Sequence, residues 1–278
     1  MDEAGNVDAA RASARRLRVI LAGGGTGGHL YPGLAVAEAL RKLARERGLA
    51  LALTWSATPR AVDQRLLSGF GADYVRQPVR PMTRSPGQLW AFWRGWRASC
   101  ALWRRRMATG KGVDCLVAWG GYAAGPAAYV AAKRGVPVVL LNPDAVAGKA
   151  NRFLWKRADV IVTQFAAAEE GHVKALGCPI RAELMGRSRG EGAARLGVDA
   201  GLQTLVVTGA SLGARTINDA VPLMMENERV RAAFTGGVGG GDSHGWQIIH
   251  LAGMAQAEAV RAGYAKWPGG RAKVTLAR

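Results

Sequence analysis

The chain has 278 residues, enough to bury a sizeable core in one large domain or in two modest ones. A hydrophobic fraction of 49% excludes an intrinsically disordered chain, and three cysteines without metal-ligand spacing exclude a disulfide framework. The formal net charge of +18 calls for an anionic partner or surface, and nucleic acid, anionic lipid and anionic substrates all remain open.

Two stretches bear on targeting. Residues 1–16 contain no apolar signal-peptide region, so we expect them to form a flexible leader. Residues 115–132 lack any charge and imitate a membrane span, but Gly120-Gly121 and Gly125-Pro126 interrupt them. A strand, a glycine loop and a helix explain this stretch better than a spanning helix, and the sequence predicts a soluble protein.

A glycine-rich loop follows the first predicted strand, the apolar run at residues 17–22. Residues 33–40 are rich in helix formers with apolar side chains at helical spacing. The loop between them reads Gly23-Gly24-Gly25-Thr26-Gly27-Gly28-His29. Glycines permit close backbone approach and free N–H groups at a helix start attract anions, so this order predicts an anion cradle. The alternative is a tight turn without a ligand.

The loop does not specify a nucleotide cofactor. Gly23, Gly25 and Gly28 fit the dinucleotide pattern, but the next strand, residues 51–56, ends without the acidic residue that would hold a ribose. A phosphate-binding P-loop would need Lys and then Ser or Thr where this chain has His29 and Leu30. We expect neither a cofactor nor a metal.

An aromatic and basic helix is predicted at residues 88–107. It holds four of the nine tryptophans, and the stretch between Asp73 and Asp114 contains nine basic residues and no acidic one. Such a stripe is typical of a core-facing amphipathic helix, but indole rings and arginines also favour a membrane–water interface. Both interpretations remain open. No RNA-binding motif accompanies the stripe, and the membrane interpretation assigns contacts to Leu89, Trp90, Phe92, Trp93 and Trp96.

The next stretch continues a doubly wound sheet. Residues 115–119 predict a buried strand, which a second glycine turn at residues 120–126 connects to a helix. Residues 137–141 form a near-continuous apolar run, as parallel sheets require, and Asn142-Pro143-Asp144 would end it at the ligand-binding edge. Residues 159–163 are predicted as the last strand of this half.

A second Rossmann-like lobe follows a linker at residues 177–181. Its opening repeats the first theme, with a strand at 205–208, a glycine loop at 209–215 and a helix at 216–225. Residues 236–245 hold six glycines and predict a mobile loop, and two further strands are expected at 247–250 and 273–276. The sequence thus predicts an α/β fold of two doubly wound lobes, residues 17–181 and 182–278, the second incomplete.

Five motifs in order resemble the bacterial lipid II-forming N-acetylglucosaminyltransferases, which have the GT-B fold. They are Gly24 to His29 with Tyr31-Pro32-Gly33-Leu34-Ala35; Gly120-Gly121-Tyr122 with Gly125-Pro126; Gly148 with Asn151-Arg152; Gly177 with Pro179 and Arg181; and Ser211 with Gly213-Ala214-Arg215. This resemblance implies inverting, metal-independent transfer of GlcNAc from UDP-GlcNAc to the C4 hydroxyl of MurNAc in undecaprenyl-linked lipid I. The transfer would take place at the cytoplasmic face of the membrane.

The resemblance also implies roles for individual residues. His29 would be the general base, while Thr26, Gly27 and Gly28 would lie against the donor or acceptor pyrophosphate and sugar. Arg181 would neutralise phosphate where the lobes meet, and Ser211 at a helix N-terminus would bind the donor diphosphate. The aromatic and basic helix coincides with the membrane-facing segment of the family.

Two features depart from the family pattern. Asp144 stands where the family usually has Asn, which puts a carboxylate beside the donor diphosphate. The family also continues beyond Arg278 with an acidic motif for ribose and uracil, so we expect a truncated second lobe and impaired activity. The alternatives are another GT-B glycosyltransferase, a non-catalytic membrane-surface binding remnant and, more weakly, a basic nucleic-acid binder.

Overall fold

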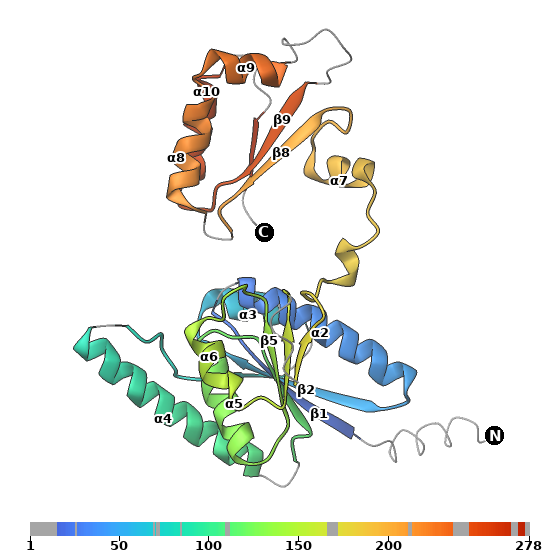
Figure 1. Cartoon of the computed structure of the whole chain (residues 1–278), viewed down its shortest axis with the longest axis vertical. Helices are drawn as coiled ribbons and strands as arrows, with labels where there is room; N and C mark the ends of the chain where they lie inside the picture. The colour runs from blue at the N-terminus through green and yellow to red at the C-terminus, as the bar shows by residue number, and fades with distance from the viewer. Residues whose placement is uncertain are drawn as a thin grey trace, which may run out of the picture. The chain divides into compact units, whose positions relative to one another are not determined.

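The protein consists of two compact units that divide between Met185 and Gly186 (Figure 1). A computed structural model describes residues 16–25, 27–68, 70, 73–83, 85–108, 112–165, 172–210, 213–235, 245–267 and 272–275. The expected leader lies outside these residues except for Arg16, which begins the first strand. In the described parts of the chain, no helix combines the length and hydropathy needed to cross a bilayer.

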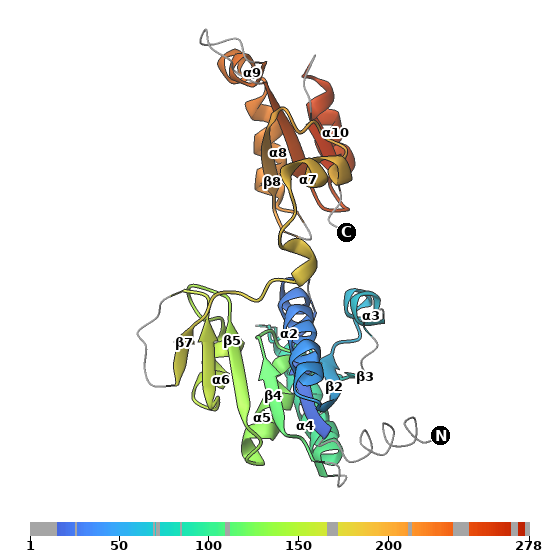
Figure 2. The same ribbon diagram turned by 90° about the vertical axis from the view of Figure 1, so that its right-hand side faces the viewer.

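The first unit is built on a sheet of seven strands in the order β3-β2-β1-β4-β5-β6-β7. Every neighbouring pair is parallel, and β1 occupies the middle region with crossovers on both sides. Figure 2 shows β7 at one edge. The strands are β1 (Arg16–Ala22), β2 (Ala50–Ala57), β3 (Asp73–Arg76), β4 (Cys115–Ala118), β5 (Val138–Asn142), β6 (Val160–Thr163) and β7 (Val173–Ala175).

Helices cover both faces of this sheet because its strands are apolar on both sides. On β1, Val19 and Leu21 join one core with residues of α2 and α3, while Ile20 and Ala22 join a second core with α4, α5 and α6. Helices α4 and α5 pack against each other (Figure 1). The helices are α2 (Gly27–Glu46), α3 (Ala61–Ser68), α4 (Pro86–Ala108), α5 (Ala124–Lys133) and α6 (Lys149–Trp155).

Strand β7 corrects the prediction that residues 159–163 form the last strand of this half. Those residues form β6, and β7 pairs with it through Ile161, Val162 and Thr163. The strand is only three residues long and buries only Val173, so it shows neither an apolar run nor an alternation that a sequence pattern could reveal.

The second unit contains three described parallel strands in the order β10-β9-β8, the order that β3-β2-β1 has in the first unit. Helices α8 and α10 supply part of its core around Ile248 and Val260. The predicted mobile loop lies outside the described residues apart from Gly245. The elements are α7 (Arg189–Leu196), β8 (Gln203–Thr208), α8 (Arg215–Met224), α9 (Glu228–Thr235), β9 (Trp246–Leu251), α10 (Ala257–Ala265) and β10 (Ala272–Thr275).

Candidate active site

The glycines after β1 make room for a buried tryptophan. A Cβ on Gly23 would overlap the indole Nε1 of Trp119, and a Cβ on Gly33 would overlap its Cζ2. Gly25 has a φ of 91°, which L side chains rarely adopt. Packing therefore explains part of the glycine pattern that predicted an anion cradle, and backbone conformation explains another part.

A buried carboxylate fixes this first glycine turn. Asp63 on α3 is 1% exposed and accepts hydrogen bonds from Gly25 N–H at 2.7 Å, from Thr58 N–H at 2.7 Å and from Thr58 Oγ1 at 2.8 Å. A Cβ on Gly24 would lie 2.5 Å from Asp63 Oδ2, and Arg60 donates to the carbonyl of Gly25 at 2.8 Å. Sequence reasoning missed Asp63, whose signal is an acidic residue in the first turn of a helix directly after a strand.

The second glycine turn lies against the first. Gly120 and Gly121 both have positive φ, 94° and 72°. A Cβ on Gly121 would lie 3.3 Å from the carbonyl oxygen of Gly24 and 3.3 Å from Cε1 of His29. The imidazole of His29 thus lies where the turns after β1 and β4 meet, at the carboxyl edge of the sheet.

His29 is half-buried in the first turn of α2. Burial lowers the pKa of its imidazole, whereas the negative charges of Asp144 and Asp63 act in the opposite direction. The lowered pKa favours the neutral imidazole at pH 7. A neutral imidazole can accept a proton from a hydroxyl group, which is the chemistry a general base requires.

A chain of amides joins the loop after β5 to the second turn. Asn151 donates from Nδ2 to Oδ1 of Asn142 at 2.8 Å, and Asn142 donates from Nδ2 to the carbonyl of Asp144 at 2.8 Å. The Oδ1 of Asn151 is buried without a hydrogen-bond partner in the described parts of the chain, and a Cβ on Gly120 would lie 2.7 Å from it. Asp144 itself is exposed, and its charge acts on His29 from this loop.

The other predicted site residues are only partly brought together. Arg181 stacks 4.8 Å from the ring centroid of Tyr31, two residues after His29, and forms an ion pair with Glu183. Helix α2 begins at Gly27, and Gly28 is exposed. Thr26 and Ser211 lie outside the described residues.

Among the residues that the structure describes, no group of three or more His, Cys, Asp or Glu could hold a metal ion. The three cysteines are free, and burial raises the pKa of each thiol. A raised pKa keeps the thiols protonated and poorly reactive.

Helix α4 divides its aromatic side chains between core and surface. Trp103 is 1% exposed and donates from Nε1 to Oε1 of Gln77 at 3.1 Å. Trp96 is half-buried, and a Cβ on Gly125 would lie 2.6 Å from its Cζ3. The core interpretation of the stripe is therefore correct for this face of the helix.

The N-terminal end of α4 carries exposed apolar side chains. Trp90 is 62% exposed, Trp93 54% and Leu89 38%, and the nearby Met82 is 53% exposed. Phe92 is half-buried and contacts Trp93 edge to face, with the ring centroids 5.3 Å apart. We call Met82, Leu89, Trp90 and Trp93 the α4 patch.

Comparison with solved structures shows the fold. MurG of Acinetobacter baumannii matches 95% of this chain with a TM-score of 0.60 at 24% identity, over 68% of its own chain. A UDP-glucosyltransferase from Polygonum tinctorium matches 95% with a TM-score of 0.60 at 15% identity, over 72% of its own chain. The predicted GT-B glycosyltransferase fold is thereby confirmed.

Sequence comparison then identifies the family. Residues 19–163 match the glycosyltransferase family 28 N-terminal domain, so the chain belongs to glycosyltransferase family 28. The UDP-N-acetylglucosamine–N-acetylmuramyl-(pentapeptide) pyrophosphoryl-undecaprenol N-acetylglucosamine transferase of Acidothermus cellulolyticus is 35% identical over 245 residues, 86% of this chain. Its counterpart in Clavibacter michiganensis is 37% identical over 243 residues, 85% of this chain. The chain spans 62% and 61% of the lengths of these relatives, respectively.

Proposed function

We propose that the chain transfers GlcNAc from UDP-GlcNAc to the C4 hydroxyl of MurNAc in undecaprenyl-linked lipid I, forming lipid II for peptidoglycan. The observation that carries this proposal is the position of His29, whose ring lies against both glycine turns at the carboxyl edge of the first sheet. The names of the curated relatives support the choice of donor and acceptor.

In this proposal His29 takes the proton of the acceptor hydroxyl. The hydroxyl oxygen forms a bond to the anomeric carbon of GlcNAc from the face opposite UDP, and the bond from that carbon to the diphosphate breaks, which inverts the anomeric configuration. UDP leaves with the electron pair of the broken bond. General-base catalysis of this kind contributes about 10²–10⁴-fold to the rate.

The leaving diphosphate needs positive potential, which helices and arginine supply without a metal. The N-termini of α2 and α5 follow the two glycine turns, and the N-cap of α5, Ala123, makes no side-chain cap. The Nε of Arg181 is buried without a hydrogen-bond partner among the described residues, so it remains as a donor for a phosphate oxygen. Asp144 would oppose diphosphate binding nearby while keeping His29 more basic.

For the α4 patch we propose contact with an anionic membrane at the cytoplasmic face. Four large apolar side chains between Met82 and Trp93 are exposed, and Arg94 lies 4.7 Å from the ring centroid of Trp90. Indole rings next to arginines suit the boundary between headgroups and acyl chains. Such contact would bring the unit that carries His29 close to a lipid-linked acceptor. We do not propose nucleic acid as a partner.

The direct test of the function is a transferase assay with radiolabelled UDP-GlcNAc and a lipid I analogue. It should use the 278-residue chain and, in parallel, a fusion to the remaining C-terminal portion of a curated relative. We expect the fusion to transfer GlcNAc from UDP-GlcNAc and to use UDP-glucose much more slowly, and we expect the 278-residue chain to have little or no activity. Preference for another nucleotide sugar would indicate a different GT-B glycosyltransferase. Vesicle binding without transfer by either protein would indicate a non-catalytic membrane-binding protein.

The membrane contact has its own test, in which matched tryptophans of α4 are replaced. Trp90→Ala with Trp93→Ala should weaken binding to vesicles containing anionic lipid at every ionic strength, because salt does not screen apolar insertion. Trp103→Ala is the control: it should destabilise the fold by about 3–5 kcal/mol and leave vesicle binding of the folded protein unchanged. Unchanged vesicle binding in the double variant would contradict the membrane role.

A further inference from the structure

The second unit contains a buried polar network at the carboxyl end of β9. His250 is 0% exposed, and Asn218 in the first turns of α8 is 2% exposed. The imidazole Nε2 lies 3.0 Å from Oδ1 of Asn218, and Nδ1 lies 2.9 Å from the hydroxyl oxygen of Tyr264 on α10. Buried polar groups that all find partners hold their elements in one arrangement.

The acceptors around Asn218 fix where the protons lie. Its Nδ2 donates to the carbonyl of Ala252 at 2.7 Å and to Oε1 of Gln256 at 2.6 Å. Its Oδ1 therefore faces His250 and must accept, so the imidazole carries its proton on Nε2. The bare Nδ1 then accepts from the Tyr264 hydroxyl. The network is complete with every member neutral, and burial lowers the pKa of His250 accordingly.

The same amide reaches the turn after β8. Gly213 has a φ of 77°, and a Cβ there would overlap the carbonyl of Ala252 and lie 3.2 Å from Nδ2 of Asn218. Gly213 N–H donates to the carbonyl of Ala210 at 3.2 Å, and Ala210 has a φ of 62°. A non-glycine residue at positive φ is strained and must be held by its surroundings. The backbone after β8 therefore packs directly on the loop after β9, with Asn218 at the junction.

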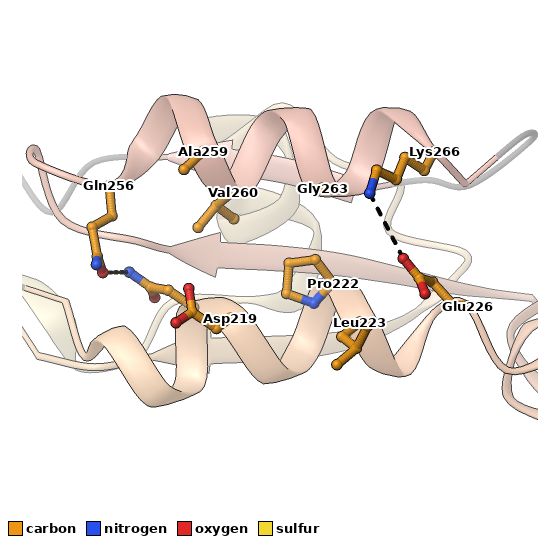
Figure 3. Close-up of a pocket in the computed structure, with 10 residues that line it drawn as sticks. Asp219, Pro222, Leu223, Glu226, Gln256, Ala259, Val260, Gly263 and Lys266 are labelled. Atoms are coloured by element: carbon orange, nitrogen blue, oxygen red, sulfur yellow. Dashed lines mark hydrogen bonds and ion pairs between the residues drawn. The ribbon is translucent and has the colours of Figure 1, made fainter.

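The helices that carry this amide are themselves held together. Figure 3 shows α8 and α10 side by side, with Gln256 bonded across at one end and Lys266 paired with Glu226, 3.9 Å away, at the other. Between them, a Cβ on Gly263 would lie 2.7 Å from Cβ of Pro222. The cavity of about 260 Å³ between the helices has Asn218 and Gln256 in its lining. Asn218 thus receives support from both helices as well as from β9.

We propose that Asn218 is a positioning residue that holds Gly209, Ala210 and Gly213 after β8 on the loop after β9, so that these residues and the start of α8 present a preformed edge to the diphosphate of a nucleotide sugar. This rests on the proposed function, because the family resemblance assigns the donor diphosphate to this turn through Ser211, which lies outside the described residues. Helix α8 starts directly after this turn, and its N-cap, Ala214, makes no side-chain cap. Its first N–H groups can therefore donate to an anion, and a backbone fixed in advance loses less entropy when the anion binds.

The test compares variants of two buried networks on the same strand. Asn218→Ala removes the amide, and Tyr264→Phe removes only the hydroxyl that orients His250. Gln247→Ala is the matched control: Gln247 is 5% exposed at the other end of β9 and bonds to Thr204 Oγ1 at 2.9 Å and to Asp199 N–H at 3.0 Å. Amide hydrogen exchange would be measured on peptides that cover residues 208–214 and 251–256, and the Kd of UDP-GlcNAc by calorimetry.

We expect Asn218→Ala to speed exchange in both peptides and to weaken UDP-GlcNAc binding about tenfold, with smaller effects of the same kind in Tyr264→Phe. Gln247→Ala should lower Tm without either change. If Asn218→Ala does not fold, the exchange and the Kd measured for Tyr264→Phe test the proposal. Variants that lower Tm but leave the exchange in these peptides and the Kd at control values would overturn the proposal. If the unsubstituted chain does not bind UDP-GlcNAc, the proposed donor is contradicted. Faster exchange in the Asn218→Ala variant would then still support the role of Asn218 in positioning the turn.

Discussion

The two units begin with the same strand–turn–helix but hold the turn in different ways. In each unit the strand before the turn pairs with the next strand of the chain, and that strand pairs with the one after it. The orders are β3-β2-β1 in the first unit and β10-β9-β8 in the second. In the first unit the ionisable carboxylate of Asp63 accepts three hydrogen bonds beneath the turn. In the second unit the neutral amide of Asn218 makes the corresponding hydrogen bonds, to the carbonyl of Ala252 and to His250.

This difference suits the chemistry proposed for each turn. The first turn carries His29, and the negative charge of Asp63 opposes the fall in its pKa that burial causes. The second turn is expected to receive the donor diphosphate, and the amide of Asn218 adds no negative charge beside it. The comparison indicates that either a carboxylate or a neutral amide can fix the same strand–turn–helix motif.

The two histidines differ in the same sense. His29 is half-buried against both glycine turns, while His250 is fully buried with both ring nitrogens engaged by protein side chains. His29 is therefore the proposed catalytic residue, whereas the contacts of His250 indicate a structural role. In the sequence alone, both are single histidines next to glycine-containing loops.

The largest expected effect is on the chemical step. His29→Ala should lower kcat by about 10²–10⁴-fold, with a smaller change in the Kd of UDP-GlcNAc, because it removes the base and leaves the diphosphate contacts. The measurement is turnover at saturating substrates, in the chain and in the fusion to the C-terminal portion of a relative. His172→Ala, an exposed histidine beside β7, is the control and should keep its rate. A fall of less than about threefold in the His29 variant, roughly 0.65 kcal/mol, would make His29 structural.

The next effect would separate the stabilities of the two units. Asp63→Asn replaces an acceptor of three hydrogen bonds by an amide that opposes at least one donor, so the first unit should lose roughly 2–4 kcal/mol. Global hydrogen exchange, read separately on peptides of each unit, would show the loss in the first unit alone. The control Asp144→Asn changes an exposed carboxylate and should stay within about 0.5 kcal/mol. Equal losses in both variants would contradict the role of Asp63.

The third effect concerns pH. Burial lowers the pKa of His250, so the unfolded state binds a proton more readily than the folded state. Stability of the second unit should therefore be constant above the ordinary pKa of histidine, about 6.5, and fall as the pH drops below it, by at most about 1.4 kcal/mol per pH unit. Urea unfolding followed by exchange in β9 would measure this slope. His250→Gln should flatten it, and an unchanged slope would show that another group is responsible.

The smallest effect tests the charge beside the first turn. Because the carboxylate of Asp144 raises the pKa of His29, Asp144→Asn should move the acidic limb of the kcat/KM profile to lower pH. It should also tighten UDP-GlcNAc binding if that carboxylate repels the donor. An acidic limb that does not move would mean that His29 does not set it.

Local patterns in the sequence were sufficient for the repeating elements. A continuous apolar run, a glycine turn and a helical stripe are patterns among near neighbours in the chain, which is why β1, α2, β5 and the strands of the second unit could be predicted. The GT-B class was predicted from the resemblance of five motifs to a known family. Element ends moved by a few residues, as in α4, which runs from Pro86 to Ala108 where 88–107 was expected. Helices α6, α7 and α9 and strand β7 were not predicted, although Ser188 and Glu191 give the start of α7 a capping-box signature.

Tertiary structure decided which side chains meet. Asp63 reaches Gly25 across 38 residues of sequence, and His250 reaches Asn218 across 32, and no local pattern relates such distant positions. Trp93, Trp96 and Trp103 of α4 lie on one side of the helix by their spacing, and the packing of that helix leaves Trp103 buried and Trp93 exposed. Periodicity depends on residues that are close together along the chain, so the sequence alone reveals it. Which groups contact one another depends on the faces and edges that the folded sheet brings together.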